Sequence, residues 1–228
     1  MKNKPALLLY FVACTVFMFA VVMNNSNLML VSKPVIVPAI FFYYLQEKKV
    51  RFNWSFVLII MLSFIGDMIV LIDLPDFFVL IVSVFLIAYL FFLKGLVDDL
   101  VVIRLRIINK THLFALLICV FFLIYLLISM IDVLMEAKTE NMYLMVFYGI
   151  TLVAIGTIAS LNYIIRPSRY TTFMIFTSLS FVFSDIFYIL KKDFLEIEIL
   201  SYLNNFTQII SYYYLTKYYL LKDSRNEI

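Results

Sequence analysis

Long apolar runs separated by short polar segments extend along almost the whole chain. An α-helix needs about 20 mostly apolar residues to cross the hydrocarbon core of a bilayer. Eight runs approach this length, and the breaks between them contain asparagine, proline or clustered charges. The pattern predicts transmembrane helices over residues 5–23, 28–45, 54–73, 76–93, 112–134, 142–165, 170–190 and 199–221. We therefore expect an all-α, polytopic membrane helix bundle that forms a single domain over residues 1–228.

The positions of lysine and arginine predict the orientation of these helices. If the N-terminus is cytoplasmic, 13 of the 18 basic residues lie in inner segments, and Lys33 and Lys217 lie within helices. The outer segments then contain only Lys138, Lys191 and Lys192. Because cytoplasmic loops are enriched in basic residues, we expect both termini to be cytoplasmic (N-in/C-in). The expected location is a bacterial inner (plasma) membrane.

Two segments near the inner side carry specific expectations. Residues 94–110 mix charged and apolar positions, which predicts a short amphipathic helix on the inner membrane surface. Lys217 lies near the inner end of the last predicted helix, so its ammonium group is expected to extend toward the interface.

The composition excludes several classes of function. Of the 228 residues, 65% are hydrophobic and 14% charged, whereas ordinary soluble domains have about a quarter charged residues. The two cysteines lie in apolar runs and His112 is the only histidine, so neither a disulfide framework nor a multi-histidine metal site is expected. Four glycines leave little scope for a phosphate-binding loop. We expect no cofactor, no metal and no nucleic-acid partner, and the sequence leaves the oligomeric state open.

Three ionisable residues lie well inside predicted helices: Lys33, Asp67 and Asp185. With 3.6 residues per helical turn, all three lie about one to two turns from the outer ends of their helices. They therefore occupy one layer, where two acids and a base can neutralise one another if the helices are neighbours. Charged groups in the membrane are costly and usually mark functional sites. A structural ion-pair network that holds the helices in register is the alternative.

Polar residues extend this layer. Asn204 and Gln208 lie four residues apart near the outer end of the last predicted helix, so they share one face. Gly66 precedes Asp67 and would let another backbone approach closely. We expect a polar pocket that opens toward the outer half of the bilayer.

Five short segments, in this order, resemble the YhhN-type lysoplasmalogenase family of small integral membrane proteins. They are Ser-Lys-Pro-Val at 32–35, Leu-Ser-Phe-Ile-Gly-Asp at 62–67, Phe-Leu-Ile-Ala-Tyr at 85–89, Phe-Ser-Asp at 183–185 and Tyr-Tyr-Leu-Thr-Lys at 213–217. They are similar to the family's Thr-Lys-Pro-Leu, Leu-x-x-Gly-Asp, Phe-Leu-x-Ala-His, Leu-Ser-Asp and Tyr-Tyr-x-Ala-Gln motifs. The chain departs from the pattern at Tyr89, where the family has histidine, and at Lys217, where it has glutamine.

The resemblance implies hydrolysis of the vinyl-ether bond of a lysoplasmalogen or related lysophospholipid within the membrane. Vinyl-ether hydrolysis requires a general acid and a carboxylate, and the resemblance assigns these roles to Asp67 and Asp185 without deciding between them. Lys33, Asn204, Gln208 and Tyr89 are the expected substrate-binding residues, and membrane lipids are the expected surroundings. Two alternatives remain open: a non-catalytic lipid-binding membrane protein and a small proton-coupled transporter.

Overall fold

A computed structural model describes residues 4–48, 52–72, 77–102, 110–136, 141–193 and 197–225. These residues form eight α-helices and no strand, and each helix overlaps one predicted segment. The all-α fold class is therefore confirmed. The helices are α1 Pro5–Val22, α2 Ser26–Glu47, α3 Trp54–Ile72, α4 Phe78–Val102, α5 Lys110–Glu136, α6 Met142–Ile165, α7 Arg169–Asp193 and α8 Glu198–Arg225.

Seven of these helices, α1 to α7, are long and apolar enough to cross a membrane, which is the composition of an integral membrane protein. Helix α8 is long enough, at 28 residues, but it carries more polar side chains than the others. An eighth crossing and the N-in/C-in orientation therefore stay predictions.

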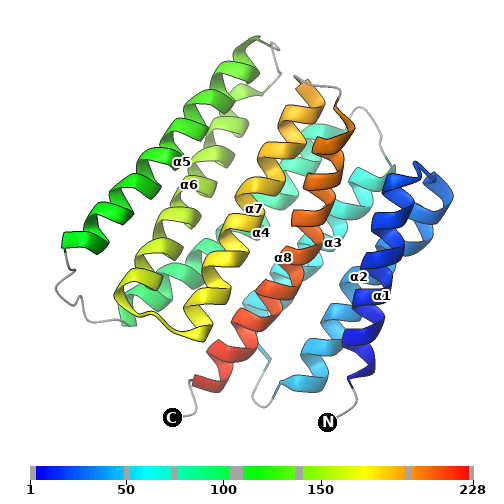
Figure 1. Ribbon diagram of the computed structural model, residues 1–228, viewed down its shortest axis with the longest axis horizontal. Coiled ribbons are helices and arrows are strands. Elements are labelled where there is room, and N and C mark those ends of the chain that lie inside the picture. Colours follow the sequence, from blue (N-terminus) through cyan, green and yellow to red (C-terminus); the bar gives the residue numbers. More distant parts are fainter. Residues whose placement is uncertain are drawn as a thin grey trace.

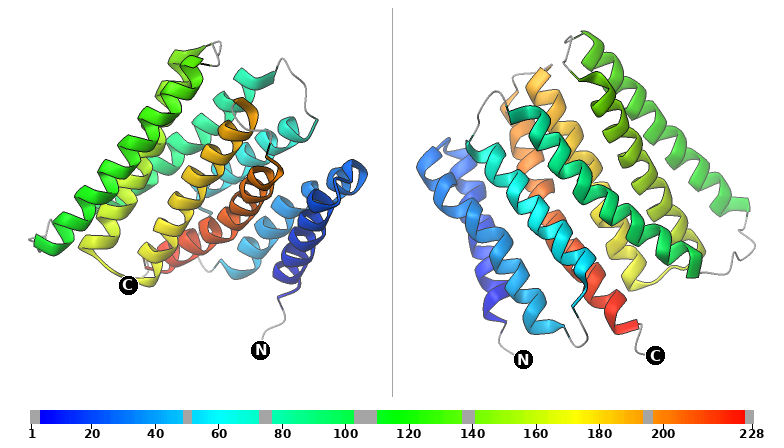
Figure 2. Two further views of the ribbon diagram at one scale, coloured as in Figure 1. Left: turned by 45° about the horizontal axis from the view of Figure 1, so that its top comes forward. Right: turned by 180° about the vertical axis from the view of Figure 1, so that it is seen from behind.

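The helices pack as one bundle in which each helix runs roughly antiparallel to the next, and both termini lie at the same end (Figure 1). The α1–α2 hairpin lies at one side of the bundle and the α5–α6 hairpin at the other (Figures 1 and 2). Helix α8 packs along α7 and also contacts α1, α2 and α3. As a result, α8 contacts α2, α3 and α7, the helices that carry Lys33, Asp67 and Asp185.

Local sequence explains how the first hairpin begins and turns. Pro5 occupies the first turn of α1, where its missing N–H would have no helical partner. The Asn25 side chain accepts a hydrogen bond from the Leu28 N–H at 3.1 Å and so caps α2. At the other end of this hairpin, Lys4 forms a partly exposed ion pair with Glu47 at 2.9 Å, and this contact raises the pKa of Lys4.

Helix α4 corrects the expectation for residues 94–110. It continues without a break to Val102, so its last turns belong to a helix of the bundle and not to a separate surface helix. The reason is packing: Leu96 and Asp99 are both buried, and the Asp99 carboxylate pairs with the Lys222 ammonium of α8. Residues 103–109 lie outside the described residues.

Helix α5 is the most peripheral element, and much of its apolar surface is exposed. It approaches α6 closely at two glycines. A Cβ on Gly149 would lie 2.5 Å from a methyl carbon of Leu127, and one on Gly156 would lie 2.8 Å from a methyl carbon of Leu123. An exposed apolar helix of this kind is suited to contact with lipid chains.

Candidate functional site

Lys33 of α2 and Asp67 of α3 form a buried ion pair. The Lys33 ammonium lies 3.6 Å from Asp67 Oδ1, and the residues are 5% and 2% exposed. The ammonium also lies 5.5 Å from the centre of the Phe17 ring of α1, within range of a cation–π contact. A buried charge without a partner is strongly unfavourable, so each of these two groups compensates for the burial of the other.

Helix α8 supplies two further partners for Asp67. The Gln208 side-chain amide donates to Oδ1 at 2.6 Å, and the Tyr212 hydroxyl donates to Oδ2 at 2.6 Å. Both carboxylate oxygens therefore accept a hydrogen bond, and one also faces a cation. This is an environment in which an ionised carboxylate, which can only accept hydrogen bonds, is well satisfied.

Asp185 of α7 has a different environment. The Tyr148 hydroxyl of α6 donates to Asp185 Oδ2 at 2.8 Å, and Tyr89 of α4 lies within interaction range of both groups. The Tyr89 ring packs between Tyr148 and Phe181, with centroid distances of 5.5 and 5.0 Å. Among the described residues, no lysine or arginine forms an ion pair with Asp185. Asp185 is also partly exposed, whereas Asp67 is buried.

The two aspartates do not contact each other in the described part of the chain, since each binds its own tyrosine. Tyrosines stand beside both acids, and Tyr89, beside Asp185, is within electrostatic range of Tyr212, beside Asp67. The structure thus joins Lys33 to Asp67 directly, whereas no direct contact joins Asp67 to Asp185 among the described residues.

Asn204, predicted on the same face of α8 as Gln208, lies beside the residue that precedes Asp185. Its side-chain oxygen accepts a hydrogen bond from the Ser184 hydroxyl at 2.8 Å. The two polar residues of this face therefore serve different acids: Gln208 contacts Asp67 directly, and Asn204 reaches the neighbourhood of Asp185 through Ser184.

We call this set of polar residues the distal cluster, because it lies in the half of the bundle away from both termini. Its members come from six helices: Lys33, Asp67, Tyr89, Tyr148, Ser184, Asp185, Asn204, Gln208 and Tyr212.

The structure corrects two expectations about neighbouring residues. Gly66 is close to a side chain and not to another backbone, since a Cβ there would lie 2.8 Å from the Phe85 ring of α4. Lys217 does not extend toward the interface but points into the bundle, where its ammonium donates to the Tyr43 hydroxyl of α2. A hydroxyl acceptor within reach on α2 explains why this lysine turns inward.

A second polar group, the proximal cluster, lies at the end of the bundle that holds the termini. Here the Lys222 ammonium lies 3.0 Å from Asp99 Oδ1, and the Tyr218 hydroxyl donates to Asp99 Oδ2. Lys222 also donates to the Gly95 carbonyl at 3.1 Å. These contacts join α4 to α8 and give the Lys222 ammonium and both Asp99 carboxylate oxygens a partner.

Tyr148 is a site residue that the sequence interpretation missed, whereas Tyr212 or Ser211 was expected to continue the polar face of Asn204 and Gln208 without a role in the reaction. Tyr212 belongs to an aromatic run that is typical of an interface belt. Tyr148 lies in an apolar segment, but it stands about two turns from the start of α6, the depth at which Lys33 stands in α2. The sequence therefore gives the depth of Tyr148 along its helix, but it does not show toward which neighbouring helix the side chain points.

Long apolar helices that bury a lysine and an aspartate as an ion pair define an integral membrane protein with a polar site inside the bundle. The particular family follows from the sequence: residues 28–223 match the YhhN family, so the chain belongs to that family. The family resemblance drawn from the five short motifs is thereby confirmed. No curated protein and no solved structure matches the chain.

Proposed function

We propose that this protein is a membrane-embedded hydrolase that cleaves the vinyl-ether bond of lysoplasmalogens or a related lysolipid. The observation that carries the proposal is the unequal setting of two acids in one cluster. Asp67 has a cation and two hydrogen-bond donors, whereas Asp185 has tyrosine partners and no cation among the described residues. Membership of the YhhN family supports a hydrolase-like role.

The chemistry requires one acid and one base. A general acid protonates the vinyl carbon remote from the ether oxygen, and the positive charge develops on the carbon bound to that oxygen as an oxocarbenium ion. A base then removes a proton from water while the water oxygen adds to this carbon. The resulting hemiacetal loses the glycerol oxygen, which takes a proton, and the products are a fatty aldehyde and a glycerophospho head group. Positioned acids and bases typically accelerate such steps by about 10²–10⁴-fold.

The partners of the two aspartates suggest which acid takes which role. A carboxylate inside a helix bundle is costly without a cation beside it, even when it is only partly buried, so Asp185 is the better candidate for the neutral form that delivers the proton. Asp67, beside the Lys33 ammonium, is the better candidate for the ionised base. When the hemiacetal breaks down, its hydroxyl proton ends on the leaving glycerol oxygen, and the proton that Asp67 took from water passes to Asp185, so both acids return to their starting states.

The remaining members of the cluster position groups around the reacting bond. Lys33 favours the ionised form of Asp67, and Gln208 orients its carboxylate. Asn204 has its oxygen occupied by Ser184, which leaves its amide N–H₂ available to a glycerol hydroxyl or to water. Tyr89 replaces the family's histidine and, with Tyr148, holds Asp185 in place.

The proposal includes a topology of eight crossings with both termini in the cytoplasm of a bacterial inner membrane. Helix α8 lies along α7 and has comparable length (Figure 1). Its polar residues Gln208 and Tyr212 face Asp67 inside the bundle and not the lipid, so they do not oppose a crossing. This topology places the distal cluster in the outer half of the bilayer, where a single-chain lipid can enter sideways.

The direct test measures aldehyde release from a lysoplasmalogen by the purified protein in proteoliposomes. We expect release by the natural protein and a decrease of about 10²–10⁴-fold in Asp67→Asn and in Asp185→Asn. The matched control is Asp99→Asn, which makes the same change at a buried acid of the proximal cluster and should leave the rate per folded molecule nearly unchanged.

Three results would contradict the proposal. Equal release from the natural protein and both distal variants would show that the two acids do not act in the reaction. No release from the natural protein, together with retained binding of the lysolipid, would favour a non-catalytic lipid-binding protein. Counterflow of a solute in the same vesicles would instead favour a transporter.

A further inference from the structure

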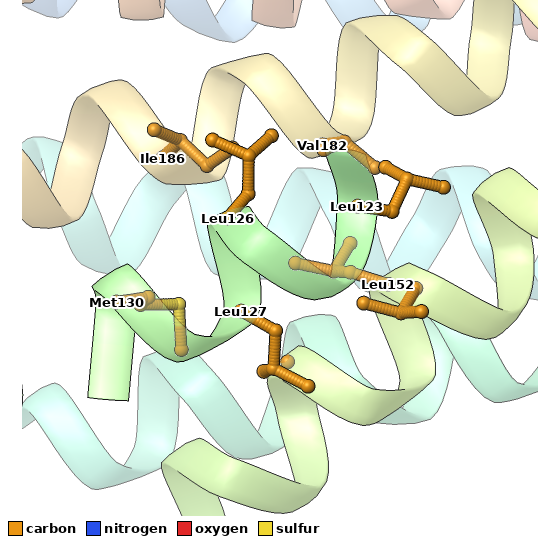
Figure 3. A pocket seen from close by; sticks show the side chains of 9 residues that line it. Leu123, Leu126, Leu127, Met130, Leu152, Val182 and Ile186 are labelled. Carbon is orange, nitrogen blue, oxygen red and sulfur yellow. The ribbon is translucent and has the colours of Figure 1, made fainter. Parts of the chain in front are cut away.

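An apolar pocket lies between α5, α6 and α7, on the side of the bundle opposite the α1–α2 hairpin. It is lined by nine residues, none of which has a charged or hydrogen-bonding side chain. In Figure 3, Leu126 and Leu127 of α5, Leu152 of α6 and Val182 and Ile186 of α7 converge on this space. The pocket contains about 290 Å³ that no protein atom occupies, part of it open to the outside.

The pocket adjoins the hydrogen bond between Tyr148 and Asp185. On α7, Val182 precedes Asp185 by three residues and Ile186 follows it directly. On α6, Gly149 follows Tyr148 directly and Leu152 follows it by four residues. Residues three or four apart on a helix are neighbours on its surface. Asp185 and Tyr148 do not line the pocket themselves, but each is a helix neighbour of residues that do.

The structure assigns this pocket to the aliphatic chain of a single-chain lipid whose polar end lies in the distal cluster. The assignment rests on the proposed function, because the vinyl-ether bond of a lysoplasmalogen is the junction between its polar and aliphatic parts. A bond placed at Asp185 puts the head group on the side of Asn204 and Gln208 and requires an apolar space for the chain on another side. The pocket at Val182 and Ile186 provides that space.

Two features fit a lipid chain better than a compact ligand. A pocket without polar groups offers a ligand no directional contact, which suits methylene groups. It is also bounded by α5, whose outer surface is exposed and apolar, so a chain can reach it from the lipid without crossing water. The assignment predicts that the pocket residues determine preference for chain length.

The test narrows the pocket and measures hydrolysis of a long-chain and a short-chain lysoplasmalogen. Leu126→Trp introduces a larger side chain at the pocket wall. We expect it to lower kcat/KM for the long-chain substrate by about tenfold or more, since single methylene groups are discriminated by at least that factor. Hydrolysis of the short-chain substrate should persist, which also shows that the variant is folded.

The matched control is Leu117→Trp, the same substitution on the same helix at a position that is 58% exposed and does not line the pocket. It should leave the ratio of the two kcat/KM values unchanged. Equal changes of that ratio in both variants, or no change in either, would overturn the assignment.

A second measurement does not depend on hydrolysis. A lysophospholipid with a photoreactive diazirine at the end of its chain is crosslinked to Asp185→Asn in vesicles, and the labelled residues are identified by mass spectrometry. The assignment is supported if the label is found at residues 123–130 and 149–153 and if excess two-chain phospholipid does not displace it. Label spread over exposed α5 residues such as Leu117, and displaced by that phospholipid, means ordinary lipid contact and overturns it.

The two measurements separate the pocket from the reaction. Specific label in the pocket without aldehyde release would retain the chain site and reject vinyl-ether hydrolysis. Aldehyde release with an unchanged ratio in Leu126→Trp and label elsewhere would retain hydrolysis and reject this site for the chain.

Discussion

The distal and proximal clusters are built from the same kinds of residue, yet their arrangements differ. Each contains a lysine paired with a buried aspartate, and in each a tyrosine of α8 donates to that aspartate. In the proximal cluster the Lys222 ammonium lies 3.0 Å from Asp99 Oδ1, and it also contacts the Gly95 carbonyl and the Tyr218 hydroxyl. In the distal cluster the ion pair is longer, at 3.6 Å, and a second acid, Asp185, lies nearby without a cation among the described residues.

The comparison teaches that an intramembrane ion pair alone does not indicate catalysis. The proximal cluster joins α4 to α8, and its groups satisfy one another, so it explains the stability of that end of the bundle. The distal cluster has two acids with unlike partners and an apolar pocket beside one of them. Acid–base catalysis needs one protonated and one ionised group, and two acids with different partners can provide them.

The largest expected effect separates the two lysines. Lys222→Met leaves Asp99 buried without its cation and should destabilise the protein by about 3–5 kcal/mol, while the rate of aldehyde release per folded molecule stays nearly unchanged. Lys33→Met should lower that rate as well, because it removes the cation beside Asp67. Thermal unfolding in detergent measures the first effect and the assay in proteoliposomes the second. A normal rate in folded Lys33→Met would make the two ion pairs equivalent and remove the basis of the comparison.

A smaller effect separates two tyrosines that donate to aspartates. Tyr148→Phe removes the hydrogen bond to Asp185, worth about 1–2 kcal/mol, and should lower the rate about five- to thirtyfold by misplacing the acid. Tyr218→Phe removes the comparable bond to Asp99 and should change the unfolding temperature but not the rate. The rate should also be measured as a function of pH. If Tyr148 had a purely structural role, Tyr148→Phe would not change the pH dependence of the rate.

The smallest expected effect on the rate of aldehyde release concerns the two glycines of these regions. A Cβ on Gly66 would lie 2.8 Å from the Phe85 ring, whereas one on Gly95 would lie 3.1 Å from the Tyr219 hydroxyl. Gly66→Ala should therefore cost about 1–3 kcal/mol of stability and displace the neighbouring Asp67 slightly, with a modest loss of rate. Gly95→Ala should be milder and affect stability alone. A larger loss of rate in Gly95→Ala would contradict this order.

The sequence predicted the helices better than it predicted the contacts between them. The length and composition of the apolar runs identify all eight helices, and α6 begins and ends where the pattern suggests. Helices α4 and α8 extend further than expected because the charged residues at their ends pair with each other across the bundle. Hydropathy treats such residues as breaks and contains no information about partners.

The same limit applies to the candidate site. Counting turns from the helix ends placed Lys33, Asp67 and Asp185 at one depth, and the structure pairs the first two. Depth does not state which way a side chain points around its helix. For this reason, the tyrosines beside Asp67 and Asp185, and the inward direction of Lys217, required the packed bundle.

The late position of α8 in the chain has a consequence for biosynthesis. Asp67 lies 141 residues before Gln208 and 145 before Tyr212, so neither of these donors exists when α3 leaves the ribosome. Lys33, in the preceding helix, has already been made and is the partner then available for inserting an acid into the lipid. Lys33 can therefore pair with Asp67 as soon as α3 enters the membrane. Gln208 and Tyr212 can donate their hydrogen bonds to Asp67 only after α8 has been synthesised and has packed into the bundle.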